Sequence, residues 1–351
     1  MMTKSILKKA GRFSVLVLTI FVAFISMPSV SYGAQKPHKE MKLKMHGHTR
    51  QGMEYIYYAQ KIFPDYVNKR GKGIVHIDMY WGNTLMKSKH ALAGLRSGAA
   101  DIIMLPAAYL AGSMPILGIQ SLPVWGSIAE SFKDLKIGSP LYKLQNEELK
   151  KKNIYQLASS GQIPNYIFTA KKLIRTPGDM KGLKLRVPGR VASKVLKEIG
   201  AVPVSMPSAE IAQSLQRGII DGVVINPWSF PMYGVVDLCK YMLVAPFSGI
   251  SAPLFVLWDK WKSWPEDVRR VLMEAAEMYD VNFIAPEGGV RDEQVKNTLL
   301  PAYEKYGLKA IYPTKETKAE FRNMQKPLFD WWVKEVGEDV GRKALKIINI
   351  R

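Results

Sequence analysis

The chain has 351 residues, of which 47% are hydrophobic and 23% are charged, and its formal net charge is +20. These proportions are typical of a globular protein of about two domains, and they exclude a disordered chain, a collagen-like fibre and a polytopic membrane protein. The single cysteine, Cys239, excludes an internal disulfide and a cysteine-based metal cluster.

The N-terminal segment has the layout of a secretory signal peptide. Four basic residues precede an almost wholly apolar stretch over 13–27, and Ser31-Tyr32-Gly33 places small residues before a cleavage site after Gly33. The apolar stretch is shorter than the roughly 20 residues that a membrane span needs, although an uncleaved anchor is the alternative. Cleavage would remove 33 residues and four positive charges, leaving 318 residues and a charge of +16. We therefore predict a periplasmic protein with a signal peptide over 1–33.

The remaining sequence alternates predicted strands and helices. The first group is a strand at 43–45, a helix at 51–69 that Pro64 should kink or end, a strand at 73–80, a helix at 87–96 and a buried strand at 101–105. The second group is a strand ending at 187, a helix at 190–198, a strand at 202–205, a helix from Pro207 to 217 and a strand at 223–225. A helical region from Pro265 to about 304, a short strand near 310 and a helix at 315–336 follow. This alternation predicts an α/β fold.

One short sequence pattern occurs twice in the chain, with a spacing of 120 residues. Residues 95–102 read as a helix end, a glycine, two apolar residues and an aspartate before a strand, and residues 215–222 repeat this order. The spacing is too long for a solenoid repeat, but it suits two similar α/β lobes. Chance is the alternative, because a helix that ends at glycine before a strand is common.

The middle of the chain resembles a known family. Met180-Lys181-Gly182-Leu183-Lys184-Leu185-Arg186-Val187-Pro188, followed by 200–207 and then by Leu215-Gln216-Arg217-Gly218 and Asp221-Gly222, is similar to the signature of the solute-binding proteins of tripartite ATP-independent periplasmic (TRAP) transporters, the DctP family. Weaker similarity extends over nearly the whole mature chain.

The resemblance implies a periplasmic-binding-protein-like fold with two lobes, a ligand cleft between them and a long C-terminal helical region. We expect lobe I to comprise 34–163 and 253–291, and lobe II to comprise 164–252 and 292–351. It also implies a monomer that binds a small organic acid and delivers it to the membrane subunits of a TRAP transporter. A binding module that serves a sensor is an alternative.

In this family an arginine after the Lys-Gly-Leu-Lys run pairs with the ligand carboxylate, and that position is Arg186 here. Its place near the end of an apolar strand agrees, since a guanidinium binds a carboxylate through two parallel hydrogen bonds. A surface or packing arginine is the alternative.

The resemblance implies other ligand-binding candidates. His46 falls where the family's first strand ends, and it is equally readable as a structural histidine. Tyr166 lies where sialic-acid binders carry a second arginine, and Pro106 lies where they carry a glutamate, so sialic acid is not expected. Asn226 resembles the asparagine of the family's Asp-Gly-x-x-Asn pattern, although three residues rather than two separate it from Gly222 here. Trp228 is expected to line the pocket or, alternatively, to pack in the core.

These departures favour a monocarboxylate with an apolar or aromatic body, walled by Trp228, Tyr166 and Phe255, over a C4-dicarboxylate. We expect no cofactor and no metal, because the pair His46 and His48 has no apparent third ligand.

No nucleophile elbow, P-loop or zinc-protease motif is present, so an enzyme is the lesser hypothesis. Lysines are spread along the chain without aromatic platforms, so we expect no nucleic-acid binding.

Overall fold

The computed structural model describes residues 38–51, 56–123, 127–283 and 292–350. The predicted signal peptide, 1–33, lies outside the described residues. None of the described helices combines the length and the apolar character that crossing a membrane requires.

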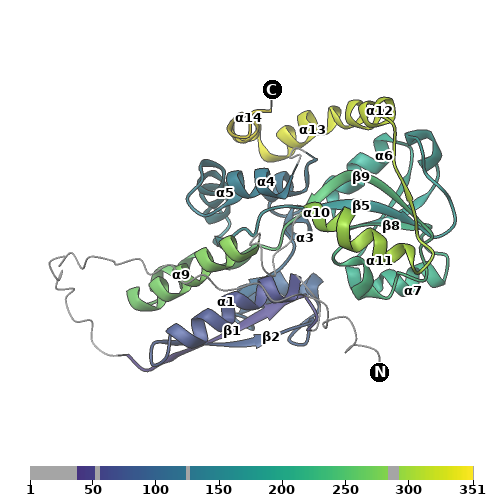
Figure 1. Cartoon of the computed structure of the whole chain (residues 1–351). Coiled ribbons are helices and arrows are strands. Elements are labelled where there is room, and N and C mark those ends of the chain that lie inside the picture. The colour runs from purple at the N-terminus through teal and green to yellow at the C-terminus, as the bar shows by residue number, and fades with distance from the viewer. Residues whose placement is uncertain (1–37, 52–55, 124–126, 284–291, 351) are drawn as a thin grey trace, which may run out of the picture. The chain divides into compact units, whose positions relative to one another are not determined.

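The strands and helices follow one another along the described chain (Figure 1). The strands are β1 (Met41–Gly47), β2 (Val75–Tyr80), β3 (Ile102–Met104), β4 (Ile154–Ala158), β5 (Ile163–Thr169), β6 (Lys184–Val187), β7 (Val202–Ser205), β8 (Gly222–Ile225), β9 (Tyr241–Ile250), β10 (Leu254–Leu257) and β11 (Lys309–Ile311). The helices are α1 (Ile56–Arg70), α2 (Ala91–Ser97), α3 (Ala107–Leu110), α4 (Ile128–Leu135), α5 (Pro140–Lys150), α6 (Arg190–Glu198), α7 (Ile211–Gln216), α8 (Trp258–Ser263), α9 (Glu266–Phe283), α10 (Asp292–Gln294), α11 (Leu300–Glu304), α12 (Lys315–Gln325), α13 (Pro327–Val336) and α14 (Glu338–Ile347).

The described strands form two mixed sheets. The first has the order β2-β1-β3-β10-β4, and the second has the order β11-β9-β5-β8-β6-β7. In the first sheet β1 pairs in parallel with β2 and β3, while β10 runs antiparallel to both of its neighbours. In the second, β6 pairs in parallel with β7 and β8, while β5 runs antiparallel to β8 and β9. The predicted α/β fold is confirmed.

The two segments with the repeated pattern build the same local structure in both sheets. Gly98 and Gly218 follow α2 and α7 with φ of 77° and 67°, in the left-handed region that glycine adopts without a Cβ clash. Three residues later, an aspartate joins the next strand to its neighbour. Asp101 donates its N–H to Lys44 O at 2.8 Å and accepts from Lys44 N at 2.8 Å, and Asp221 makes the same pair with Lys184 at 2.7 and 2.8 Å.

Two chain crossings connect the sheets. β4 of the first sheet leads directly into β5 of the second through 159–162, and β9 leads back into β10 through 251–253. These crossings lie near the predicted lobe boundaries, at 163/164 and 252/253. The division into lobes stays a prediction.

Long helices cover the sheets. α1 packs along α9, and the two run side by side in Figure 1. The helix does not end at Pro64: it continues to Arg70, because Ala59, Phe63 and Val67 are buried by tertiary packing that offsets one missing backbone hydrogen bond. At the other end of the chain, α13 and α14 contact the 3₁₀ segment Pro115–Ser121 and α5, respectively.

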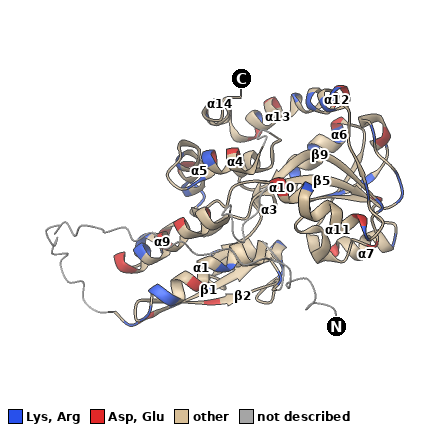
Figure 2. Ribbon diagram, in the orientation of Figure 1, with Lys and Arg blue, Asp and Glu red and all other residues tan. Residues whose placement is uncertain are grey.

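Several elements were absent from the sequence-based prediction. The strands β4, β5, β9 and β10 were not predicted, and α14 extends the C-terminal helical region beyond 336. Residues 133–152, a run of charges of both signs that the sequence predicts as helical, belong to two helices, because Gly138, at φ 81°, and Ser139 at the start of α5 separate α4 from α5. Figure 2 shows Lys and Arg interspersed with Asp and Glu on the ribbon rather than gathered on one element.

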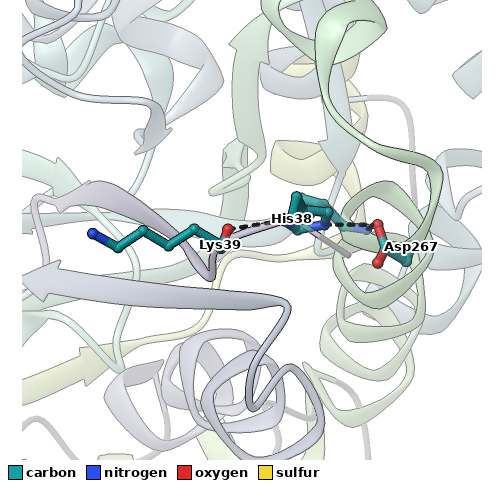
Figure 3. A network of polar contacts seen from close by, with 4 residues as sticks. His38, Lys39 and Asp267 are labelled. Carbon is teal, nitrogen blue, oxygen red and sulfur yellow. Dashed lines mark hydrogen bonds and ion pairs between the residues drawn. The ribbon is translucent and has the colours of Figure 1, made fainter. Parts of the chain in front are cut away.

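The first described residue is tied to α9 (Figure 3). The ring nitrogens of His38 lie 2.9 Å from Lys39 O and 3.1 Å from Asp267 Oδ1. Both partners are acceptors, so only the protonated imidazole can donate to both, and these bonds raise the pKa of His38.

We predict that Gly98→Ala and Gly218→Ala have matched effects. Neither glycine has a heavy atom within 4 Å of an added Cβ, so only the left-handed backbone opposes alanine. Each substitution should lower the free energy of unfolding by about 1 kcal/mol, as measured by urea denaturation. Gly112→Ala, which has equally open space at an ordinary φ, is the control. Equal effects at all three positions would contradict the explanation.

Candidate functional site

A pocket lies where several strands of both sheets end. His48 and Thr49 follow β1, Pro106 follows β3, Arg186 lies in the second half of β6 and Asn226 follows β8. The carboxyl ends of parallel strands are where open α/β folds bind ligands. The empty space between the lining residues is about 520 Å³, and this figure includes open solvent.

Arg186 is the only Lys or Arg among the described residues that line this pocket. Its side chain is 1% exposed. Nε donates to Met206 O at 3.0 Å and Nη1 to Val224 O at 3.2 Å. No described carboxylate forms an ion pair with it, and burial lowers its pKa. The charge of Glu210 opposes this shift without forming an ion pair, so the guanidinium keeps a buried charge whose hydrogen-bond acceptors are all neutral.

Tyr109 of α3 connects the first sheet's side of the pocket to this arginine. Arg186 Nη2 donates to Ser208 Oγ at 3.1 Å and lies 3.5 Å from the Tyr109 hydroxyl. That hydroxyl also accepts from Ser208 N at 3.2 Å and lies 3.3 Å from Ser208 Oγ. Tyr109 thus touches the charged group directly from another part of the chain.

The histidines near the pocket are neutral at physiological pH. Burial lowers the pKa of His46 and of His48 to about 4, and the second cause at His48 is the proximity of His46. Neither histidine therefore supplies a positive charge above about pH 5. No group of three or more His, Cys, Asp or Glu side chains that could hold a metal ion occurs in the described part of the chain.

Of the residues predicted from the sequence, Arg186, Asn226 and Pro106 line the pocket together. Asn226 Oδ1 accepts from Ser229 N at 2.8 Å, which fixes the turn after β8. The other three, His46, Tyr166 and Trp228, are buried but are not among the lining residues.

The geometry of the strands explains this division. In β5, Asn165 lines the pocket and Tyr166 does not, because successive side chains of a strand point to opposite faces. Trp228 donates from Nε1 to Gln294 Oε1 at 2.7 Å, and Phe255 is fully buried in the core. The ligand role of His46, Tyr166 and Trp228 stays a prediction, and none of the three side chains lines the pocket.

Sequence reasoning missed most of the polar lining. Thr49, Gln60, Asn165, Ser208, Ser229, Tyr233 and Ser251 all line the pocket. Of these, Asn165 could have been found from the alternation of side chains between the two faces of β5, had that strand been predicted. The others lie in turns or on helix sides that converge only through folding.

A residue of α9 holds the crossing between β4 and β5. Asp280 is 2% exposed, and its carboxylate accepts from Ser159 N, Ser160 N and Ile137 N, each at 3.0 Å. Ser160 has φ of 66°, unusual for a non-glycine residue, and its hydroxyl accepts from Ala252 N at 3.0 Å in the second crossing. Asp280 therefore fixes both connections on which the relative placement of the sheets depends.

Residues 46–335 match the family described as bacterial extracellular solute-binding protein, family 7 (DctP). The chain belongs to this family. It is 28% identical over 251 residues to a solute-binding protein of Albidiferax ferrireducens, which covers 70% of this chain and 71% of that protein. It is 27% identical over 298 residues to the C4-dicarboxylate-binding periplasmic protein DctP of Rhodobacter capsulatus, covering 82% and 84%.

Solved structures share the fold. A TRAP periplasmic solute-binding protein of Roseobacter denitrificans with bound β-D-glucuronate has a TM-score of 0.78 at 19% identity, covering 88% of this chain and all of that one. One of Rhodoferax ferrireducens with bound malonate has a TM-score of 0.75 at 23% identity, covering 87% and 98%. The two-lobe fold of TRAP solute-binding proteins is confirmed, and the family is one of solute-binding proteins rather than enzymes.

The pKa of Asp280 predicts a pH effect on stability. Burial raises that pKa to about 6, although the N–H groups of Ser160, Ile137 and Ser159 oppose the shift. The folded chain thus holds this proton more tightly than the unfolded chain, and stability is lost as the pH rises from about 4 to about 6. Nearby Glu277 favours the same protonation.

In urea denaturation, the stability of the wild type relative to Asp280→Asn should therefore fall between pH 4 and pH 7 by on the order of 1–3 kcal/mol. Comparison with the variant cancels titrations elsewhere in the chain. A difference that stays constant or grows with pH would contradict the raised pKa.

Proposed function

We propose that this protein is the extracytoplasmic solute-binding component of a TRAP-type transporter and that it captures a small monocarboxylate. The observation that carries the proposal is the buried guanidinium of Arg186, which faces a pocket and has no acidic partner among the described residues. A ligand carboxylate would supply the missing charge and two parallel hydrogen bonds.

The hydrogen bonds of Arg186 leave room for such a ligand. One N–H of Nη1 donates to Val224 O, and the second is unassigned. Nη2 donates to Ser208, and its contact to Tyr109, at 3.5 Å, is long. A carboxylate can therefore approach the edge formed by the two terminal nitrogens. The carboxylate ligands of the Roseobacter and Rhodoferax proteins support this chemistry by analogy.

The charge of the pocket favours one carboxylate over two. No second Lys or Arg is among the described lining residues, and His48 is neutral above about pH 5. A second buried carboxylate would have no cation to pair with, which costs several kcal/mol. Ile56, Ile163, Ile225, Ile250 and Phe283 provide apolar surface for the body of the ligand.

Binding would be coupled to closure of two lobes. We propose that they divide as the sequence predicts, at 163/164, 252/253 and 291/292. Arg186 belongs to the second sheet, whereas Thr49 and Gln60 belong to segments packed with the first. A ligand that contacts both favours the closed arrangement, which the membrane subunits of the transporter would recognise. Export through the signal peptide over 1–33 would place the mature chain in the periplasm.

We predict that Arg186→Met weakens carboxylate binding by at least about 30-fold, the equivalent of roughly 2 kcal/mol for a desolvated charged pair. Titration calorimetry measures the loss, and circular dichroism checks folding. Arg186→Lys should lose part of the affinity, because lysine keeps the charge without the planar fork. Arg217→Met, at an exposed position after α7, is the matched control. Undiminished binding by Arg186→Met would refute the carboxylate site.

A thermal-shift screen of residues 34–351 tests the preference for monocarboxylates. Ligands that bind only the folded state raise the melting temperature. Monocarboxylates of three to six carbons should raise it more than dicarboxylates of the same length, because Arg186 is the only Lys or Arg among the described lining residues. Larger shifts with succinate or malate than with every monocarboxylate would overturn the preference and leave the binding function intact.

A further inference from the structure

The pocket contains polar atoms that have no partner in the protein. Among the described residues, twelve buried side-chain atoms lack a hydrogen bond, and five of them belong to four residues that line this one pocket: His48, Thr49, Gln60 and Asn165. Buried polar groups are nearly always paired, since each unpaired one costs about 1–3 kcal/mol. Their concentration around one cavity indicates that a bound molecule satisfies them.

We propose that the ligand carries, besides its carboxylate, a neutral group that both donates and accepts hydrogen bonds, and that Thr49, Gln60 and Asn165 hold this group. The inference rests on the proposed function, because it assigns a second part of the same binding site. The chemical class is a hydroxyl or an amide.

The burial of these three side chains excludes ordinary solvation. Thr49 and Gln60 are 0% exposed, and Asn165 is 1% exposed. Asn165 is already oriented, since its Nδ2 donates to Ser248 Oγ at 3.2 Å and leaves Oδ1 without a partner. Gln60 interacts with the Tyr279 hydroxyl, which lowers the pKa of Tyr279, but that hydroxyl donates to Ala252 O at 2.8 Å and leaves Gln60 Oε1 without a donor.

The unpaired atoms include donors and acceptors. Gln60 Oε1 and Asn165 Oδ1 accept, Gln60 Nε2 donates, and the Thr49 hydroxyl does both. A ligand hydroxyl or amide can donate to one carbonyl oxygen and accept from Gln60 or Thr49. An oxo group only accepts, so it would leave the carbonyl oxygens of Gln60 and Asn165 unpaired.

Charged ligand groups fit these side chains poorly. A carboxylate would face the oxygens of Gln60 and Asn165 without a cation. An ammonium would be buried without an acid, because no Asp or Glu is among the described lining residues. His48, whose Nδ1 is also unpaired, is neutral and adds a further donor or acceptor according to its tautomer.

Two matched ligand series test the inference by titration calorimetry. The first is butanoate, its 2-, 3- and 4-hydroxy derivatives and 2-oxobutanoate. The second is the lactam pyroglutamate with its apolar isostere cyclopentanecarboxylate. We expect at least one hydroxy acid or the lactam to bind tenfold or more tightly than its apolar counterpart and than 2-oxobutanoate. Which series responds separates a hydroxyl from an amide.

Variants then locate the recognition. Thr49→Val and Gln60→Met remove the unpaired groups at nearly constant volume. Each should weaken the preferred ligand about tenfold and leave the affinity for its apolar counterpart unchanged or improved. Thr169→Val, at a buried threonine outside the pocket, is the matched control.

The outcomes distinguish this inference from the proposed function. If carboxylates bind but apolar and hydroxylated or lactam members bind equally well, water alone pairs with Thr49, Gln60 and Asn165, and the inference fails while the carboxylate site stands. Equal losses for both members of a pair in Thr49→Val and Gln60→Met would also overturn it. If no carboxylate binds, both proposals fail.

Discussion

The buried guanidinium of Arg186 is the constraint on which the site depends. It lies in β6, between β7 and β8, and it donates to the backbone carbonyls of Met206 and Val224. These bonds orient the side chain but do not neutralise it. Burying a charge that has only neutral hydrogen-bond acceptors is costly, and the proposed ligand carboxylate would offset that cost.

The rest of the fold brings other segments to this charge. Each sheet uses the same glycine-aspartate turn to lead a helix back into a central strand, so that strand ends gather at the pocket from both sides. Asp280 of α9 holds the first crossing through the N–H groups of Ser159 and Ser160, and the Ser160 hydroxyl accepts from Ala252 N in the second crossing. Tyr109 then reaches Arg186 and Ser208 from the end of β3. The guanidinium of Arg186 and the connections between the sheets are thus fixed by separate sets of contacts.

The lining combines one cation, several isoleucines and a group of unpaired amides and hydroxyls. In the function proposed above, the buried charge of Arg186 would supply most of the affinity for an acid. The unpaired neutral atoms would supply discrimination, since a site built to hydrogen-bond a group rejects analogues that lack it. The aromatic wall expected from Trp228, Tyr166 and Phe255 does not line the pocket, so isoleucines and Phe283 provide its apolar surface instead.

The sequence by itself determined the α/β fold, the doubled helix-glycine-aspartate turn, the family and the position of Arg186, because these depend on local periodicity, on glycine conformations and on a contiguous motif. Asn226 and Pro106 were found by the same motif-based reasoning. Only the tertiary structure decided which face of β5 meets the pocket, since a shift of one residue exchanges Asn165 for Tyr166. It also brought Thr49 and Gln60 together with Asn165, more than a hundred residues away. Such convergence depends on sheet order and on the crossings between sheets, which no local pattern encodes.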